Sequence, residues 1–260
     1  MLTLHELYDA LYEHYGPQGW WPLLECNILN QNPTGRGRCT GYHPNDYDIP
    51  TTDSQALEIM IGTILTQNTS WINAEKAIYK LNENDILSIE ALGKIPTEQL
   101  AEMIISSGYY NQKAIKLKIL INFLQKNPIS SLQNMPVEVL RNLLLSVKGV
   151  GFETADSMIL YALKKPIFVV DAYTRRLLYH MGFIPINQFK PAAYNSIQEL
   201  FHRDSSLPSD VKLYNEFHAL IVQHCVHICE KKPNCTKCFL SVSCMKKTLV
   251  EDKKKKNQTK

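Results

Sequence analysis

The chain has 260 residues, 45% hydrophobic and 20% charged, which is enough to bury one large core or two closely packed ones. Its net charge of +3 equals that of residues 251–260 alone (five Lys, one Glu, one Asp), so the rest of the chain is near neutral, and any surface for nucleic acid would have to come from local placement of charge. No apolar run approaches the ~18 residues of a membrane span, and the N-terminus is acidic and amphipathic, so we expect a cytoplasmic protein without membrane contact.

The N-terminal stretch predicts a short helix, an aromatic turn and a long loop. Leucines at helical spacing predict a helix over roughly residues 3–15, which a Gly-Pro pair ends. Trp20, Trp21 and Pro22 come next, and two adjacent tryptophans either plug a seam between domains or form the wall of a binding pocket. Residues 26–53 are rich in Gly, Pro and Asn, which predicts a loop insertion of no assigned role.

A helix then begins near residue 54, where Thr52 and Gln55 form a capping-box pattern ahead of apolar residues at core spacing. Gln67 and Trp71 follow its last apolar residues. Position alone predicts Gln67 as a solvent-facing residue at a helix end and Trp71 as a core residue.

Short helices separated by prolines follow as far as residue 132. Thr97 is the expected N-cap of one of them, directly after Pro96. Another helix starts near Lys113, with Lys116 and Lys118 close by, and these three lysines are candidates to meet a phosphate backbone. No segment alternates in the manner of a strand, so the chain is predicted to be all-α.

The most informative stretch is residues 144–173. Between two predicted helices it contains Lys148, Gly149, Val150 and Gly151, and the two glycines permit a hairpin that aims successive backbone N–H groups one way. The helix that follows adds unpaired N–H groups and the positive end of its dipole, which favour a phosphate. An ordinary helix–glycine turn–helix fits the same residues.

Five of the seven cysteines fall within one short segment. Cys229, Cys235, Cys238 and Cys244 have the spacing C-x5-C-x2-C-x5-C, which brings four thiolates onto one metal centre, either zinc or iron–sulfur. Cys225, just upstream, is a spare candidate ligand, but we expect it to be a buried structural thiol.

Residues 147–155 followed by Asp171 resemble the helix-hairpin-helix and catalytic aspartate of the endonuclease III (HhH-GPD) superfamily of DNA glycosylases. Residues 65–71 and 107–114 are similar to further motifs of that family. Trp20-Trp21-Pro22 is similar to the lesion pocket of its 3-methyladenine branch. The resemblance implies a base-excision-repair enzyme that flips a damaged nucleotide out of double-stranded DNA and cuts its glycosidic bond.

The resemblance extends over about residues 54–245 and implies two helical domains with the active-site cleft between them. Residues 54–165 correspond to a six-helix barrel-type domain that carries the hairpin. Residues 1–25 and 166–248 correspond to a helical iron–sulfur domain. We expect residues 249–260 to be a disordered basic tail and the protein to be a monomer.

The resemblance also implies roles for single residues. Asp171 corresponds to the carboxylate that stabilises positive charge on the sugar in an oxocarbenium-like transition state. Gln67 corresponds to the residue that fills the gap left by the extruded base, and Tyr109 to the wedge that enters the base stack. The other implied contacts are with the DNA backbone at Lys148, Gly149, Gly151 and Thr154, and with the base at Trp20, Trp21, Pro22 and Trp71.

The cysteine loop of the family binds a 4Fe–4S cluster with the spacing C-x6-C-x2-C-x5-C. This chain is one residue short in the first interval, so Cys229 is expected to reach the cluster after a small change at the helix end. Zinc is the alternative.

Glu153 departs from the bifunctional members of the family, which have a catalytic lysine at that position. A carboxylate forms no Schiff base, so the resemblance implies a monofunctional enzyme that removes alkylated purines of the 3-methyladenine type with water and leaves an abasic site. One alternative is an endonuclease III-type glycosylase/lyase for oxidised pyrimidines. The other is a non-catalytic helix-hairpin-helix DNA-binding protein.

Overall fold

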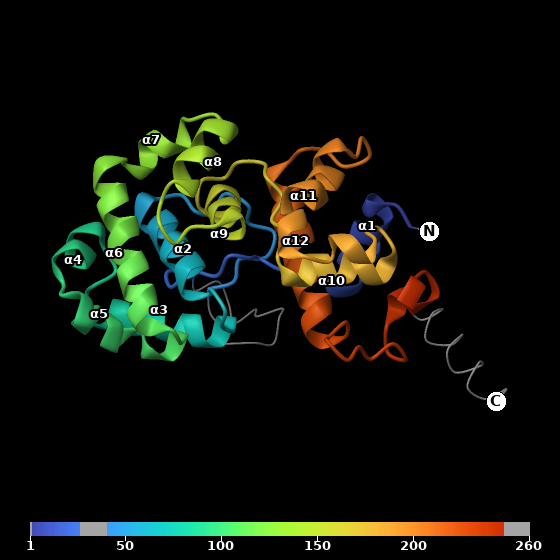
Figure 1. The fold of residues 1–260 in the computed structure, drawn as a ribbon, viewed down its shortest axis with the longest axis horizontal. Helices are drawn as coiled ribbons and strands as arrows, with labels where there is room; N and C mark the ends of the chain where they lie inside the picture. Colours follow the sequence, from blue (N-terminus) through green and yellow to red (C-terminus); the bar gives the residue numbers. More distant parts are fainter. Residues whose placement is uncertain (1, 27–40, 247–260) are drawn as a thin grey trace. The chain divides into compact units, whose positions relative to one another are not determined.

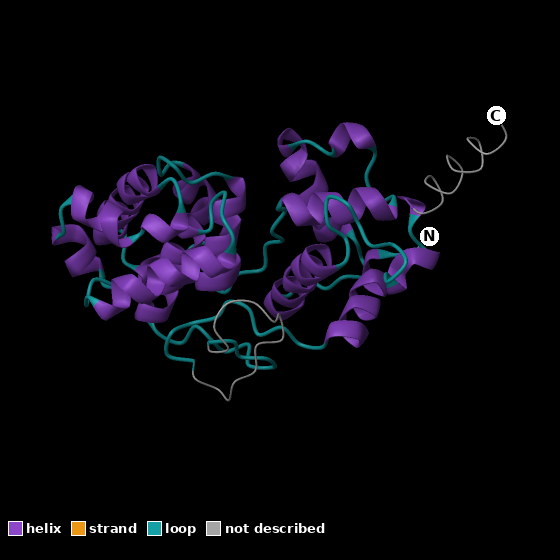
Figure 2. Cartoon of the chain, turned by 90° about the horizontal axis from the view of Figure 1, so that it is seen from below, coloured by secondary structure: helices purple, strands orange, loops and turns teal. Residues whose placement is uncertain are grey.

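Residues 2–26 and 41–246 are described in the computed structural model, and every regular element among them is a helix (Figure 2). The prediction of an all-α chain is confirmed. The basic tail at 249–260 and residues 27–40 of the 26–53 loop insertion lie outside the described residues. None of the described helices is both long enough and apolar enough to cross a membrane.

The chain forms two compact units. The central unit comprises Gln18–Ile167 and Asp210–Lys212, and the terminal unit comprises Met1–Pro17, Phe168–Ser209 and Leu213–Lys260. Each unit buries its own set of apolar side chains.

The central unit is built around α2 (Asp53–Leu65), which is buried along nearly its whole length. Helix α6 (Tyr110–Lys126), the long green helix of Figure 1, packs against α2 and against α4 (Ile89–Lys94) and α5 (Thr97–Met103). The other elements of this unit are α3 (Trp71–Glu83), α4 (Ile89–Lys94), α5 (Thr97–Met103), η1 (Ile105–Ser107), α6 (Tyr110–Lys126), α7 (Ile129–Gln133), α8 (Val137–Leu145), α9 (Phe152–Ser157) and the π-helical turn η2 (Met158–Ala162).

Two helix starts differ in detail from the sequence prediction. Thr52 caps α2 by accepting the Gln55 N–H at 3.2 Å, but the Gln55 side chain accepts from Thr51 N–H, so the capping box is only half formed. Thr97 is not an N-cap. The carbonyl of Pro96 accepts the first helical hydrogen bond from Leu100, which makes Pro96 the cap and Thr97 the first residue of α5.

The terminal unit packs its helices around stacked aromatic rings. Phe168 and Phe201 stack with ring centroids 3.5 Å apart, and Phe217 and Tyr214 meet Phe168 edge-on. The elements are α1 (Leu4–Tyr15), α10 (Ala172–Met181), η3 (Ile186–Gln188), η4 (Pro191–Ala193), α11 (Tyr194–Arg203), α12 (Val211–His227) and η5 (Phe239–Val242).

Residues 18–25 correct one predicted boundary, because they belong to the central unit and not to the cysteine-bearing one. The Trp21 indole lies directly against Gly62 of α2, and Leu24 N–H donates to the Glu58 carboxylate at 2.9 Å. The segment also runs beside residues 41–46, where Leu23 N–H donates to the Gly41 carbonyl at 2.9 Å. Part of the predicted loop insertion therefore supports the tryptophan pair.

Candidate functional site

The glycine hairpin joins α8 to α9 in the central unit. Gly149 has φ +97°, a conformation that favours glycine, and a Cβ there would lie 2.7 Å from Cγ of Lys116. Gly151 is different, because its φ of −100° suits any residue and a Cβ would meet nothing within 4 Å. The positive φ and the nearby Lys116 side chain account for a glycine at position 149. At Gly151 neither applies, and the open space there leaves room for a ligand to approach the backbone.

Gln67 does not face solvent as position alone predicted. Its side chain is half-buried and donates to the Gly149 carbonyl at 3.1 Å and to Thr154 Oγ1 at 3.0 Å. Its amide oxygen accepts from Lys116. Gln67 therefore joins the end of α2 to both sides of the hairpin.

The three lysines of α6 are used inside the protein. Lys113 is 2% exposed and its ammonium donates to the carbonyls of Leu65 and Ser107 at 2.7 and 2.6 Å. Burial lowers the pKa of Lys113 to about 8. Lys118 donates to three carbonyls at the C-terminal end of α4. Lys113 is therefore too buried to meet a phosphate, whereas Lys116 and Lys118 are half-buried and their contact with a phosphate backbone stays a prediction.

Tyr109 stands out on the surface of the central unit. It precedes α6 with φ 47°, a conformation uncommon for a residue with a side chain, and it is 66% exposed. Lys148 and Glu153 are also exposed, Lys148 before the hairpin glycines and Glu153 in the first turn of α9.

Trp20, Trp21 and Trp71 form one aromatic cluster. Trp71 meets Trp20 and Trp21 nearly edge-on, with ring centroids 5.0 and 5.4 Å apart. Trp21 is buried at the back of the cluster, while Trp20 and Trp71 are half-buried. The indole N–H groups of Trp21 and Trp71 are buried and have no acceptor among the described residues. Pro22, also buried, follows directly.

Asp171 is the N-cap of α10 in the terminal unit. Its Oδ1 accepts the Thr174 N–H at 2.7 Å, and the residue is 8% exposed. His218 of α12 places Nε2 3.7 Å from Asp171 Oδ2. Burial alone raises the pKa of this carboxyl, but His218 and the Thr174 N–H outweigh burial and lower it below its ordinary value. The site therefore holds an ionised carboxylate in a nearly dry setting.

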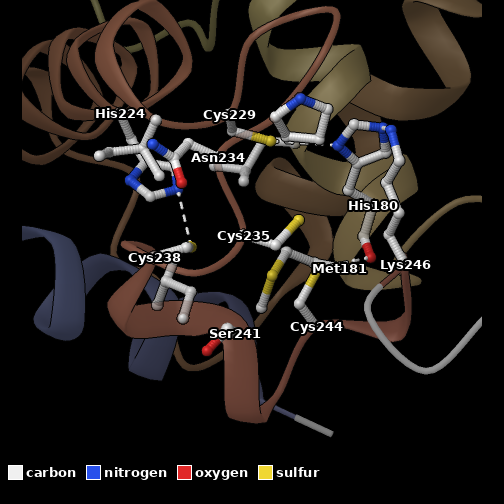
Figure 3. Close-up of a pocket in the computed structure, with 14 residues that line it drawn as sticks. His180, Met181, His224, Cys229, Asn234, Cys235, Cys238, Ser241, Cys244 and Lys246 are labelled. Atoms are coloured by element: carbon white, nitrogen blue, oxygen red, sulfur yellow. Dashed lines mark hydrogen bonds between the residues drawn. The ribbon is translucent and has the colours of Figure 1, made fainter. Parts of the chain in front are cut away.

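The four predicted cysteines line a single pocket in the terminal unit, shown in Figure 3. About 350 Å³ of space free of protein atoms, part of it open to solvent, lies between them and the side chains of His180 and His224. Arg176 of α10 fixes the end of α12 beside this pocket by donating to the carbonyls of Cys225 and Cys229 at 2.9 and 2.7 Å.

The chemistry of the pocket suits thiolate ligands. The Cys225 thiol and His180 Nδ1, at 3.1 Å from the sulfur, lower the pKa of Cys229. Burial raises the pKa of Cys238 to about 11, so binding of a metal centre would displace its proton. Cys225 itself is fully buried, contacts the Tyr173 carbonyl and does not line the pocket. This is the structural thiol that the sequence predicted.

Sequence reasoning missed His218, Glu58 and the internal use of Lys113. His218 falls on the buried face of α12 one turn from Tyr214, and a histidine on an apolar face was the available signal. The carboxylate that it faces lies too far away in sequence to be paired with it by pattern.

A helical chain with a glycine hairpin after α8 and an aspartate capping a later helix has the architecture of a helix-hairpin-helix DNA repair protein. The family profile described as "HhH-GPD superfamily base excision DNA repair protein" matches residues 61–203. The chain belongs to this family and is a DNA glycosylase of base excision repair. The alternative of a non-catalytic DNA-binding protein is therefore wrong.

Individual relatives agree with this assignment. The chain is 36% identical over 94% of its length to the "Putative DNA repair glycosylase MJ1434" of Methanocaldococcus jannaschii, of which it covers 96%. The Helicobacter pylori 3-methyladenine DNA glycosylase bound to 1,N6-ethenoadenine is 25% identical, with a TM-score of 0.63 over 86% of this chain and 97% of that one. A complex of endonuclease III with DNA has a TM-score of 0.68 at 18% identity, over 97% and 100% of the two chains, which shows the shared fold.

Proposed function

We propose that the enzyme removes N-alkylated purines of the 3-methyladenine type from double-stranded DNA. The observation that carries this proposal is the cluster of Trp20, Trp21 and Trp71. N-alkylated purines carry positive charge, and stacking on indole rings adds a cation–π attraction of ~0.5–2 kcal/mol. The two indole N–H groups without acceptors also suit a base, because every purine presents ring nitrogens or oxygens that accept hydrogen bonds. Similarity to the Helicobacter pylori 3-methyladenine DNA glycosylase supports the same substrate class.

The same proposal assigns the DNA contacts. Gly151 and the N–H groups at the start of α9 approach a phosphate, with Lys148 and Thr154 beside them. Tyr109, which is exposed, enters the base stack as a wedge. Gln67 breaks its hydrogen bonds to Gly149 and Thr154 and fills the gap that the extruded base leaves in the duplex.

Asp171 supplies the chemistry in this proposal. Loss of the base leaves positive charge on the sugar, and an ionised carboxylate held in a dry site stabilises that charge and orients the attacking water. An alkylated purine is an activated leaving group, so no strong general acid is required. Glu153 offers no amine to the sugar, which makes the enzyme monofunctional.

The cysteine pocket is proposed to hold a 4Fe–4S cluster on Cys229, Cys235, Cys238 and Cys244. The spacing of these cysteines is similar to that of the 4Fe–4S loop of the family, and all four line one pocket, which supports the cluster, with zinc as the alternative. Its work would be structural, fixing the loop after α12.

The test is incubation with a duplex that contains one 7-methylguanine or 3-methyladenine, analysed with and without alkali. We expect free alkylated base and strand cleavage only after alkali. Cleavage without alkali, together with a covalent adduct trapped by borohydride, would establish the glycosylase/lyase alternative instead. A parallel duplex with an oxidised pyrimidine should release no base.

A further inference from the structure

The buried contact between Asp171 and His218 is formed by residues from two helices of the terminal unit. Asp171 caps α10, and His218 lies near the middle of α12. Both are 8% exposed. The separation of 3.7 Å between Oδ2 and Nε2 is that of an ion pair rather than of a hydrogen bond.

Burial without a partner charge disfavours an ionised carboxylate. The Thr174 N–H and the positive end of α10 lie on the Oδ1 side and offset part of that cost. The Oδ2 oxygen faces His218, whose Nε2 lies 3.7 Å away and attracts the carboxylate when the ring is protonated.

The remaining ionisable groups near the pair have other partners. Arg175 of α10 donates to the Val170 carbonyl at 3.1 Å, and Tyr194 of α11 accepts the Val170 N–H. On α12, Cys225 contacts the Tyr173 carbonyl, and the buried Glu216 and Tyr214 lie along the same helix. His202 of α11 accepts the Phe168 N–H. Among these groups, His218 is the one that faces Oδ2, at 3.7 Å.

We propose that His218 is a positioning residue for base excision, which keeps Asp171 ionised and its Oδ2 oxygen fixed in direction before DNA binds. The part of this inference that concerns base excision rests on the proposed function, in which Asp171 is the catalytic carboxylate. Its structural part, control of the ionisation of Asp171, does not depend on the substrate. A histidine that only filled space in the core would leave the titration of Asp171 unchanged when replaced by a side chain of similar size.

The experiment compares the intact protein with its His218→Gln and His218→Asn variants. A matched control is His5→Gln, because His5 forms an exposed pair with Asp9 at 3.4 Å in the same unit. The first readout is the carboxyl carbon resonance of Asp171, followed by NMR against pH and assigned by its absence from Asp171→Asn. Circular dichroism establishes that each variant is folded.

We expect Asp171 to titrate at least about one pH unit higher in His218→Gln and His218→Asn, and at an unchanged pH in His5→Gln. The second readout is single-turnover release of an alkylated purine at pH 5 and pH 8. The rate should fall about tenfold or more at pH 5 in the His218 variants, with a smaller loss at pH 8, because deprotonation at high pH restores the carboxylate.

An unchanged titration of Asp171 in both folded His218 variants would overturn the proposal, as would equal losses of rate at pH 5 and pH 8. Failure of the proposed function has a different signature. In that case the wild-type protein releases no alkylated purine, while the shifted titration of Asp171 still establishes the role of His218.

Discussion

In each unit of the molecule a buried carboxylate accepts a backbone N–H, and the pKa values of these two carboxylates are shifted in opposite directions. Glu58 in the central unit accepts the Leu24 N–H at 2.9 Å, and burial raises its pKa to about 7. Asp171 in the terminal unit accepts the Thr174 N–H at 2.7 Å, and His218 helps to lower its pKa in spite of burial. Burial by itself favours a neutral acid. Of these two carboxylates, Asp171 is the one with a histidine beside it, and in the proposed function it is the one that acts in its ionised form.

The largest expected effect is on the rate of base release, which should depend on Asp171 and not on Glu58. Asp171→Asn should lower single-turnover base release by about 100-fold or more, because a charge aimed at the transition state is lost while asparagine still caps α10. Glu58→Gln should leave the rate within about twofold. Comparable losses in both variants would remove the distinction between them.

Substitutions at two nearby cysteines, Cys229 and Cys225, should differ in their effect on the bound metal. Cys229 lines the pocket and Cys225 does not, although the two are close in sequence and both are buried. Cys229→Ser should lose the bound iron and the brown absorbance of the purified protein, whereas Cys225→Ser should retain both. Elemental analysis for iron, zinc and sulfide decides the matter, and a colourless zinc protein would contradict the cluster assignment.

The contributions of the two carboxylates to the free energy of unfolding should also change with pH in opposite directions. Glu58 has a raised pKa, so its contribution to stability is complete below about pH 4.3 and is lost as pH rises through about 7. Glu58→Gln should therefore raise the free energy of unfolding at pH 8 by about 1–3 kcal/mol. Asp171 has a lowered pKa, so its contribution is present above about pH 3.9 and is lost as pH falls below that value. Urea unfolding of both variants at pH 4, 6 and 8 measures these trends.

The smallest expected effects concern the two hairpin glycines, where Gly149 should matter for stability and Gly151 for DNA binding. Gly149→Ala should cost about 1–3 kcal/mol of stability, because it strains a positive φ and crowds the Lys116 side chain. Gly151→Ala should leave the unfolding midpoint nearly unchanged and weaken binding to undamaged duplex DNA several-fold. Equal affinity of Gly151→Ala and wild type for duplex would exclude a close approach of phosphate at this residue.

Local patterns in the sequence were enough to predict much of the fold. Glycine spacing located the hairpin, and cysteine spacing located four side chains that do line one pocket. Each of these signals lies within a short stretch of chain. The capping error at Thr97 had a local cause as well, since the carbonyl of Pro96 was free to begin the helix.

Contacts between distant residues were beyond the reach of the sequence. Residues 18–25 were placed in the wrong unit because the packing of Trp21 on Gly62 leaves no trace in either segment alone. Lys113 looked like a phosphate ligand because its position at the start of a helix does not reveal the carbonyls of Leu65 and Ser107. The partnership of Asp171 with His218 was invisible for the same reason.

The pH dependence of base release by the wild-type enzyme tests most directly which carboxylate acts. If Asp171 acts as an ionised group, the single-turnover rate on a duplex with one alkylated purine should not rise between pH 5 and pH 8. A rate that climbs tenfold per pH unit and levels off near pH 7 would contradict the account, because it would report a carboxyl with a pKa near 7, such as Glu58, that must lose its proton to act.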